Sequence, residues 1–166
     1  MTQKKLITVV GPTASGKTSL AISIAQHFGC EILSCDSRQF FREMQIGTAA
    51  PTEAELAMAP HHFVHHKSIF EEYSVGDYEK DALKLLDDLY QRYDNAVLVG
   101  GSGLYVNAVL KGFDSFPPID GFVRESLQQA YDANGIDWLR ERLEKLDPAY
   151  YQKVDTSNPQ RMMRAL

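Results

Sequence analysis

One short segment, residues 11–18, constrains this chain more than any other. It reads Gly-Pro-Thr-Ala-Ser-Gly-Lys-Thr and matches the pattern G-x-x-x-x-G-K-[ST] in full. The apolar residues 6–10 come directly before it and predict a short strand, and residues 18–28 carry apolar side chains at helical spacing. Because the full pattern lies between a strand and a helix, it predicts a phosphate-binding loop rather than a glycine-rich turn without a ligand.

Each residue type in this loop suits the binding of phosphate. The glycines let successive backbone N–H groups point inward at phosphate oxygens, and the following helix adds the positive end of its dipole. Lys17 supplies a mobile positive charge, and the hydroxyl of Thr18 suits Mg2+ held between protein and phosphates. The predicted phosphate-binding residues are Gly11, Pro12, Thr13, Ala14, Ser15, Gly16, Lys17 and Thr18.

A second predicted strand, residues 31–35, ends at Asp36 and places this carboxylate beside the phosphate loop. An Asp at a strand end organises Mg2+ and water in nucleotide hydrolases, whereas in other enzymes such a carboxylate orients an acceptor nucleophile. The strand expected at 96–99 ends in Gly100 and Gly101 instead of an Asp, which weakens the hydrolase interpretation. Both roles for Asp36 stay open here, beside that of an Asp that only caps a turn.

Strands and helices alternate along the first two thirds of the chain. Besides the segments above, the pattern predicts helices at 52–59 and 74–93, an extended segment at 61–66, a strand at 96–99 and a helix after Gly103. This alternation predicts an α/β fold, with a three-layer core of the kind found in P-loop NTPases and a parallel sheet.

The alternation stops at Phe116-Pro117-Pro118, and the remaining pattern is purely helical, with helices at 121–133, 137–146 and from Pro159 onward. We therefore expect a P-loop core over residues 1–115, a helical insertion or cap over residues 116–158, and the start of a helix returning to the core over residues 159–166. We also expect the chain to be part of a longer protein, because no helix-stop signal accompanies residues 164–166.

Composition bounds the class of protein. No window is apolar and long enough to span a membrane, and residues 6–10 are too few for the core of a signal peptide, so we expect a cytoplasmic protein. The two cysteines, Cys30 and Cys35, flank a predicted strand and are expected to be buried, reduced thiols. The net charge of −5 argues against a surface coated for nucleic acid, although a local patch can still hold a structured RNA.

Three further groups of residues allow both a functional and a structural interpretation. The histidines at 61, 62, 65 and 66 could bind a metal as strand neighbours, but no third ligand is in obvious reach, which favours partly buried or surface histidines. Arg140 and Arg142 resemble the lid arginines of small-molecule kinases, yet the mixed charges around them favour a solvated helix face. The aromatic pairs at 40–41 and 150–151 could stack on bases or pack in a core.

Five motifs in this order resemble the bacterial tRNA dimethylallyltransferase family: the loop at 11–18, Asp-Ser-Arg-Gln at 36–39, Ile-Gly-Thr-Ala at 46–49, Gly-Gly-Ser-Gly-Leu-Tyr at 100–105 and Asn-Pro-Gln-Arg at 158–161. The resemblance covers nearly the whole chain. It implies transfer of a dimethylallyl group from dimethylallyl diphosphate to the exocyclic amine of the adenosine that follows the tRNA anticodon, with Mg2+ as cofactor. It also implies a P-loop core with a helical insertion, in which residues 116–158 would form an incomplete tRNA-binding cap, and we expect a monomer.

The resemblance also implies roles for individual residues. The phosphate loop would hold the diphosphate of the donor, chiefly through the polar side chains of Thr13, Ser15, Lys17 and Thr18. Asp36, Lys17 and Ser102 would be catalytic, with Asp36 accepting a proton from the adenine amine. Ser102 stands where the family commonly has threonine, and it keeps the hydroxyl. The implied tRNA-binding residues are Asp36, Ser37, Arg38, Gln39, Ser102, Arg124, Gln160, Arg161, Met162, Met163 and Arg164.

Three alternatives share part of this pattern. An ATP-dependent kinase of a small metabolite would use the loop and Asp36, but the chain lacks the Asp that such an enzyme needs after Val99. An enzyme that prenylates free adenine nucleotides would share most of the motifs and differ mainly in its acceptor. A nucleotide-sensing module would share the loop and bind without turnover.

Overall fold

The computed structural model describes residues 3–112 and 121–166 of the chain. The chain divides into two compact units, Met1–Asp114 and Ser115–Leu166, each of which is described by itself. The break expected at Phe116-Pro117-Pro118 lies outside the described residues. Within the described part of the chain, no helix combines the length and the apolar character that a membrane span requires.

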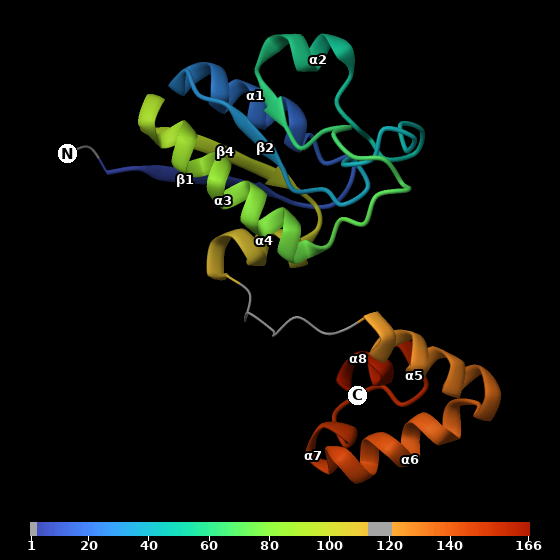
Figure 1. The fold of residues 1–166 in the computed structure, drawn as a ribbon. Coiled ribbons are helices and arrows are strands. Elements are labelled where there is room, and N and C mark those ends of the chain that lie inside the picture. Colours follow the sequence, from blue (N-terminus) through green and yellow to red (C-terminus); the bar gives the residue numbers. More distant parts are fainter. Residues whose placement is uncertain (1–2, 113–120) are drawn as a thin grey trace. The chain divides into compact units, whose positions relative to one another are not determined.

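The first unit is built on a parallel sheet of four strands in the order β1-β4-β2-β3. The strands are β1 (Lys5–Val10), β4 (Asn95–Gly100), β2 (Ile32–Ser34) and β3 (His61–His62). β4 pairs with β1 on one side and with β2 on the other, so Val99 lies level with both Val9 and Ser34. The carboxyl ends of these strands therefore share one edge of the sheet, as Figure 1 shows.

Helices pack on both faces of this sheet and complete the three predicted layers. Helix α1 (Lys17–Phe28) buries Ala21, Ile22 and Ala25 together with Val97 and Val99 of β4. Helices α3 (Val75–Arg92) and α4 (Gly103–Lys111) cover the other core cluster, which includes Leu33 and Leu98 from the strands. The sheet is apolar on both faces, as parallel sheets require, and the predicted α/β architecture is confirmed.

Local signals fix where the helices begin and end. Gly29 adopts the left-handed conformation that ends α1, and Thr52 and Ser74 begin α2 (Glu53–Met58) and α3 with capping boxes. These helices match their predicted ranges to within two residues. Cys30 and Cys35 are free and buried, as expected.

The extended segment predicted at 61–66 is a strand only at His61 and His62. Phe63 and His65 have φ values of 62° and 50°, in the left-handed region, so the chain turns away from the sheet there. His66 instead packs edge-on against Phe40 and Tyr73 in the aromatic part of the core. The strand-face pairing of histidines on which the metal interpretation depended is therefore not formed.

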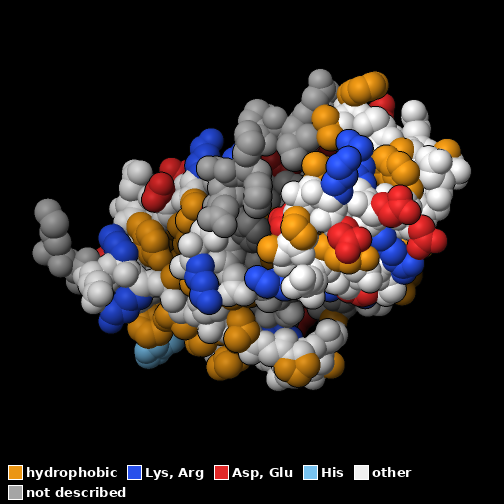
Figure 2. All heavy atoms as spheres, turned by 90° about the horizontal axis from the view of Figure 1, so that it is seen from below, with side chains coloured by type: hydrophobic (Ala, Val, Ile, Leu, Met, Phe, Trp, Pro, Cys, Tyr) orange, Lys and Arg blue, Asp and Glu red, His pale blue; other side chains and the backbone are white. Residues whose placement is uncertain are grey.

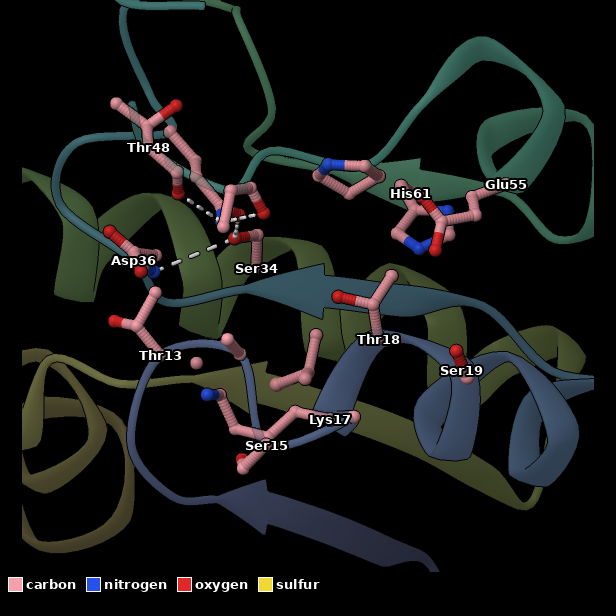
Figure 3. A pocket seen from close by; sticks show the side chains of 17 residues that line it. Thr13, Ser15, Lys17, Thr18, Ser19, Ser34, Asp36, Thr48, Glu55 and His61 are labelled. Carbon is pink, nitrogen blue, oxygen red and sulfur yellow. Dashed lines mark hydrogen bonds between the residues drawn. The ribbon is translucent and has the colours of Figure 1, made fainter. Parts of the chain in front are cut away.

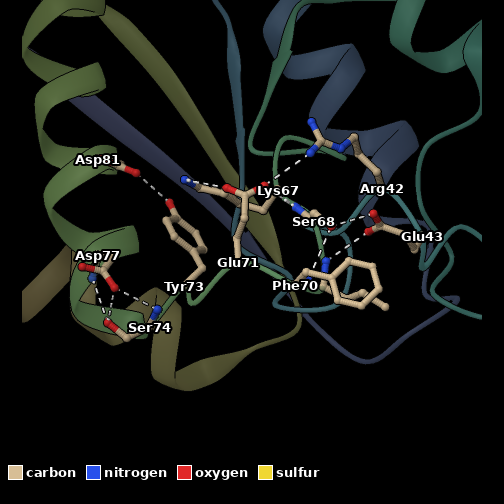
Figure 4. Close-up of polar contacts among 11 residues, drawn as sticks. Arg42, Glu43, Lys67, Ser68, Phe70, Glu71, Tyr73, Ser74, Asp77 and Asp81 are labelled. Carbon is tan, nitrogen blue, oxygen red and sulfur yellow. Dashed lines mark hydrogen bonds and ion pairs between the residues drawn. The ribbon is translucent and has the colours of Figure 1, made fainter. Parts of the chain in front are cut away.

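Two loops that follow β2 and β3 are held together by carboxylates (Figure 4). Glu43 accepts hydrogen bonds from the Ser68 hydroxyl at 2.7 Å and from the Ile69 amide at 3.1 Å. Glu71 accepts from the Ser68 amide at 2.9 Å and from Arg42 at 3.3 Å. These bonds fasten the loop after β2 to the loop after β3.

The second unit is helical and consists of α5 (Gly121–Asn134), α6 (Ile136–Leu146), α7 (Pro148–Tyr151) and α8 (Pro159–Ala165). Leu139, Leu143 and Met162 are fully buried in its core. Residues 159–166, which we expected to begin a return to the first unit, thus pack within this unit, because Met162 joins α8 to α6. Residues 121–166 carry seven Lys or Arg and seven Asp or Glu residues. On the face seen in Figure 2, blue and red side chains lie among orange ones.

Candidate active site

The phosphate-binding loop connects β1 to α1 at the carboxyl edge of the sheet. Gly16, directly before α1, has a φ of 82°, and Ala14 has a φ of 62°, so the backbone curls as the motif predicts. The ammonium group of Lys17 donates a hydrogen bond to the Pro12 carbonyl across the loop. The positive charge of Lys17 therefore lies at the loop, next to any anionic group that the backbone N–H groups bind.

A cavity of about 210 Å³ opens beside this loop (Figure 3). It is lined by residues of the loop and of the start of α1, by the ends of β2 and β4, and by the segment between β2 and β3. The lining residues are Thr13, Ala14, Ser15, Gly16, Lys17, Thr18, Ser19, Ser34, Asp36, Gln39, Thr48, Ala49, Pro51, Glu55, His61, Val99 and Gly100. Six of the eight predicted phosphate-binding residues line this cavity. The other two, Gly11 and Pro12, are not among its lining residues.

Asp36 lies in the same lining, directly after β2, because β2 and β1 run parallel and end at one edge. Its Oδ1 accepts a hydrogen bond from the Arg38 amide at 3.1 Å, and its own amide donates to Ser34 Oγ at 3.5 Å. Among the described residues, no donor is recorded for Oδ2. The carboxylate is therefore held through one of its two oxygens.

Ser102 lies beside this aspartate without lining the cavity. Its hydroxyl accepts a hydrogen bond from the Ser37 amide at 3.2 Å and lies 3.3 Å from the Ser37 hydroxyl. This pair joins the beginning of α4 to the segment that follows Asp36. The structure thus brings Ser37 and Ser102 together, and it leaves Arg38 exposed next to them.

Close packing explains the glycine at the end of β4, Gly100, whereas Gly101 makes only ordinary contacts. A Cβ on Gly100 would lie 2.5 Å from the Cys35 sulfur and 2.7 Å from its carbonyl carbon. A Cβ on Gly101 would lie 3.4 Å from the Gly11 carbonyl oxygen and 4.0 Å from Asp36 Oδ2. Burial, with the nearby charge of Asp36, raises the pKa of Cys35 to about 12, so this thiol stays protonated.

Gln39 differs from what we expected of an RNA contact, because its side-chain amide is bonded within the protein. Its Nε2 donates to the carbonyls of Thr48 at 3.2 Å and Ala49 at 3.0 Å, and its Oε1 accepts from Ser34 at 3.1 Å.

Sequence reasoning missed the part of the lining contributed by Thr48, Ala49, Pro51, Glu55 and His61. Only the Ile-Gly-Thr-Ala motif at 46–49 pointed toward it. His61 Nδ1 bonds to the Ala59 carbonyl at 2.8 Å, and burial lowers the pKa of this histidine, so the ring is neutral near pH 7.

The remaining predicted tRNA-binding residues lie in the second unit. Arg124, Gln160, Arg161 and Arg164 are exposed there. Met162 is fully buried against Leu139 and Leu143, so the prediction that its side chain contacts RNA is wrong; it is a core residue. Met163 is half-buried and packs against the same cluster.

The other functional interpretations gain no support from the structure. In residues 3–112 and 121–166, no group of three or more His, Cys, Asp or Glu side chains is placed to hold a metal ion. Arg140 donates to the Thr156 carbonyl at 3.0 Å and pairs with Asp137 at 2.7 Å, and Arg142 lies over the Trp138 ring. These arginines stabilise their own helical unit.

A parallel sheet, a phosphate-binding loop between β1 and α1, and a carboxylate just past the end of β2 at the same edge of the sheet define an α/β protein of the P-loop type. The chain belongs to the IPP transferase family, whose model matches residues 39–166.

Known relatives agree with this assignment. The chain is 59% identical over 167 residues to a tRNA dimethylallyltransferase of Flavobacterium johnsoniae, and the match covers 97% of this chain and 54% of that protein. It is 45% identical to tRNA dimethylallyltransferase 1 of Bacteroides fragilis, over 100% of this chain and 55% of that protein. The chain thus spans about half the length of the curated relatives it matches.

Solved structures agree as well. A tRNA isopentenylpyrophosphate transferase of Bacillus halodurans matches with a TM-score of 0.66 and 36% identity, over 98% of this chain and 54% of that one. A eukaryotic dimethylallyltransferase acting on tRNA matches with a TM-score of 0.81 and 25% identity, over 98% of this chain and 40% of that one.

Proposed function

We propose that this chain provides the donor site and the general base of an enzyme that transfers a dimethylallyl group from dimethylallyl diphosphate to tRNA. The acceptor is the exocyclic amine of the adenosine that follows the anticodon. One observation carries the proposal: the phosphate-binding loop and Asp36 line the same cavity. The names of the relatives, which are tRNA dimethylallyltransferases, support the choice of donor and acceptor.

The reaction requires stabilisation of the leaving diphosphate and removal of a proton from the adenine amine, and these residues can do both. The bond between the allylic carbon and the diphosphate oxygen breaks, so negative charge grows on the leaving diphosphate and positive charge on the allyl group. Lys17 and the backbone N–H groups of the loop stabilise the leaving group. The adenine nitrogen forms the new bond to the allylic carbon, and its proton passes to Asp36, whose Oδ2 has no other recorded donor among the described residues.

Mg2+ fits this cavity by the chemistry of its lining. The ion prefers oxygen ligands and commonly binds through one or two protein oxygens together with substrate phosphates. Thr18 offers a hydroxyl and Asp36 a carboxylate to the same cavity. We propose that Thr18 holds the ion, which when bound would neutralise part of the diphosphate charge.

The tRNA would be contacted from both units. In the first unit we propose Ser37, Arg38 and Ser102 as contacts, because they adjoin Asp36. In the second unit the exposed side chains supply the rest, namely Arg124, Gln160, Arg161, Arg164 and the half-buried Met163. With a net charge of −5, binding would depend on such local contacts rather than on a broad basic surface.

The end of β4 counts against the kinase alternative, because Gly100 and Gly101 stand where such an enzyme needs an Asp. An enzyme that prenylates free adenine nucleotides would use the same donor site. Competition between tRNA and AMP as acceptors distinguishes that enzyme from one that acts on tRNA.

Transfer is tested by incubating the protein with radiolabelled dimethylallyl diphosphate, Mg2+ and an unmodified tRNA that carries adenosine after the anticodon. We expect labelled tRNA that releases a prenylated adenosine on digestion. A matched tRNA with guanosine at that position is the control and should remain unlabelled. Because the chain spans about half of its relatives, donor binding is measured in parallel by calorimetry. Saturable ATP binding without donor binding would contradict the proposal.

A further inference from the structure

The segment at 48–51, which we call the donor wall, lines the cavity opposite the phosphate-binding loop (Figure 3). It belongs to no helix or strand, so no backbone ladder fixes its position. Ala49 has a φ of 50°, a left-handed conformation that alanine adopts only at a cost. The wall therefore needs side-chain contacts to keep its shape.

Gln39 supplies two of these contacts and is the side chain that reaches the wall from the segment next to Asp36. Both hydrogens of its amide group are used, because Nε2 donates to the carbonyls of Thr48 at 3.2 Å and Ala49 at 3.0 Å. The Thr48 hydroxyl adds contacts of its own, to the Met44 carbonyl at 2.8 Å and to the Gln45 carbonyl at 3.5 Å. Gln39 is thus the side chain that joins the wall to the segment following β2.

The same amide connects the wall to Asp36. Gln39 Oε1 accepts a hydrogen bond from Ser34 Oγ at 3.1 Å, and Ser34 Oγ accepts one from the Asp36 amide at 3.5 Å. A continuous path of hydrogen bonds therefore runs from the wall to the backbone of the proposed general base. Gln39 thus links the wall to the segment that carries Asp36.

The chemistry of the lining indicates what the wall contacts. Four lining residues have purely apolar side chains: Ala14, Ala49, Pro51 and Val99. Two of them, Ala49 and Pro51, belong to the wall, whereas Ala14 belongs to the loop that holds phosphate. A donor with its diphosphate on the loop and its reactive carbon near Asp36 would place its hydrocarbon tail toward this wall.

We infer that Gln39 is a positioning residue that holds the donor wall against the hydrocarbon tail of the prenyl donor, and that it acts through the wall rather than by touching RNA. This inference rests on the proposed function. It differs from the direct tRNA contact that the family resemblance implied for Gln39, because three protein partners already occupy the amide.

The test compares dimethylallyl diphosphate with inorganic diphosphate, which lacks the tail, in calorimetric titrations with Mg2+. Gln39→Leu removes every hydrogen bond of the amide, and Gln39→Glu keeps its size but cannot donate to the two carbonyls. We expect both variants to bind dimethylallyl diphosphate at least ~5-fold more weakly, the scale of one lost hydrogen bond. Binding of inorganic diphosphate should change by less than about 2-fold, since the loop is untouched.

The control is Gln91→Leu, the same change at an exposed position of α3. It should leave both affinities unchanged. The inference is overturned if Gln39→Leu keeps the preference for the prenylated ligand or if it weakens both ligands equally. If the unaltered protein does not prefer dimethylallyl diphosphate over diphosphate, the proposed function itself fails, and the inference fails with it.

Discussion

Gly100 both lines the cavity and packs tightly against Cys35. It ends β4 beside Cys35, and a methyl group there would overlap the cysteine sulfur and carbonyl carbon, at 2.5 and 2.7 Å. The sequence predicted a strand that ends at these glycines. It did not predict this contact, because Cys35 is distant in the chain. Packing of β4 on β2 leaves no room for a larger residue, such as an Asp, at this strand end.

Gly100→Ala should therefore lower the free energy of unfolding by roughly 1–3 kcal/mol, as overpacking does. The measurement is chemical denaturation of the purified variant. Gly103→Ala is the matched control, because a Cβ at Gly103 meets no heavy atom within 4 Å. That variant should stay within about 0.5 kcal/mol of the unaltered protein. Equal stability of the Gly100 and Gly103 variants would contradict the packing described here.

At the residue scale, the proposed reaction depends on Lys17 and Asp36. We expect Lys17→Ala and Asp36→Ala each to reduce turnover by at least ~100-fold, the scale of losing a transition-state charge or a general base. Donor binding should separate the two, because only Lys17 faces the diphosphate. Single-turnover rates and donor titrations provide the comparison. Near-normal turnover in either variant would remove the role given to that residue.

At the scale of elements, local signals predicted most of the structure. The strand-loop-helix unit at 5–28 and helix α3 follow from hydrophobic spacing, glycine and capping residues. The short helix α7 was missed, because four residues give no periodicity to detect. β3 is shorter than predicted, since Phe63 and His65 take left-handed conformations that nothing in their residue types requires.

Helix α3 provides a test of its capping box. The Ser74 hydroxyl accepts from the Asp77 amide at 3.2 Å, and Asp77 accepts from the Ser74 amide at 3.0 Å. Ser74→Ala should lower the free energy of unfolding by about 1 kcal/mol, as loss of an N-cap does. Thermal and chemical denaturation measure this loss. An unchanged midpoint would mean that packing alone determines where α3 begins.

At the scale of the whole first unit, the buried carboxylate of Glu31 joins β2, β3 and the end of α3. It accepts hydrogen bonds from His62 at 2.6 Å and from Arg92 and Tyr93 at 3.0 Å. Burial alone would raise the pKa of Glu31, but the bonds from His62 and Tyr93 and the charge of Arg92 outweigh it and lower this pKa. The ionised carboxylate therefore stabilises the folded state.

This shift predicts how stability depends on pH. Because the folded-state pKa lies below the unfolded value of about 4.3, the unfolded chain binds the proton first as pH falls. The stabilisation from Glu31 is complete well above that value and is lost as pH falls through the folded-state pKa. Glu31→Gln should cost about 2 kcal/mol at pH 7 and much less at pH 3. A difference that does not depend on pH would contradict this assignment.

The site as a whole was predicted only in part. The loop and Asp36 could be placed together from sequence, because parallel strands end at one edge. The donor wall could not, since its position depends on Gln39 contacting carbonyls nine and ten residues away. The burial of Met162 likewise follows from the packing of α8 on α6, which no local pattern reveals.

In the proposed site, the loop at 11–18 holds the diphosphate of a prenyl donor, with the reactive carbon near Asp36 and the hydrocarbon tail toward the donor wall. A crystal structure with Mg2+ and a non-hydrolysable thio analogue of dimethylallyl diphosphate tests it most directly. We predict the diphosphate against the backbone amides and Lys17, and the branched five-carbon tail between Asp36 and the donor wall. A purine triphosphate bound there in preference, with its terminal phosphoryl group toward Asp36, would contradict the account.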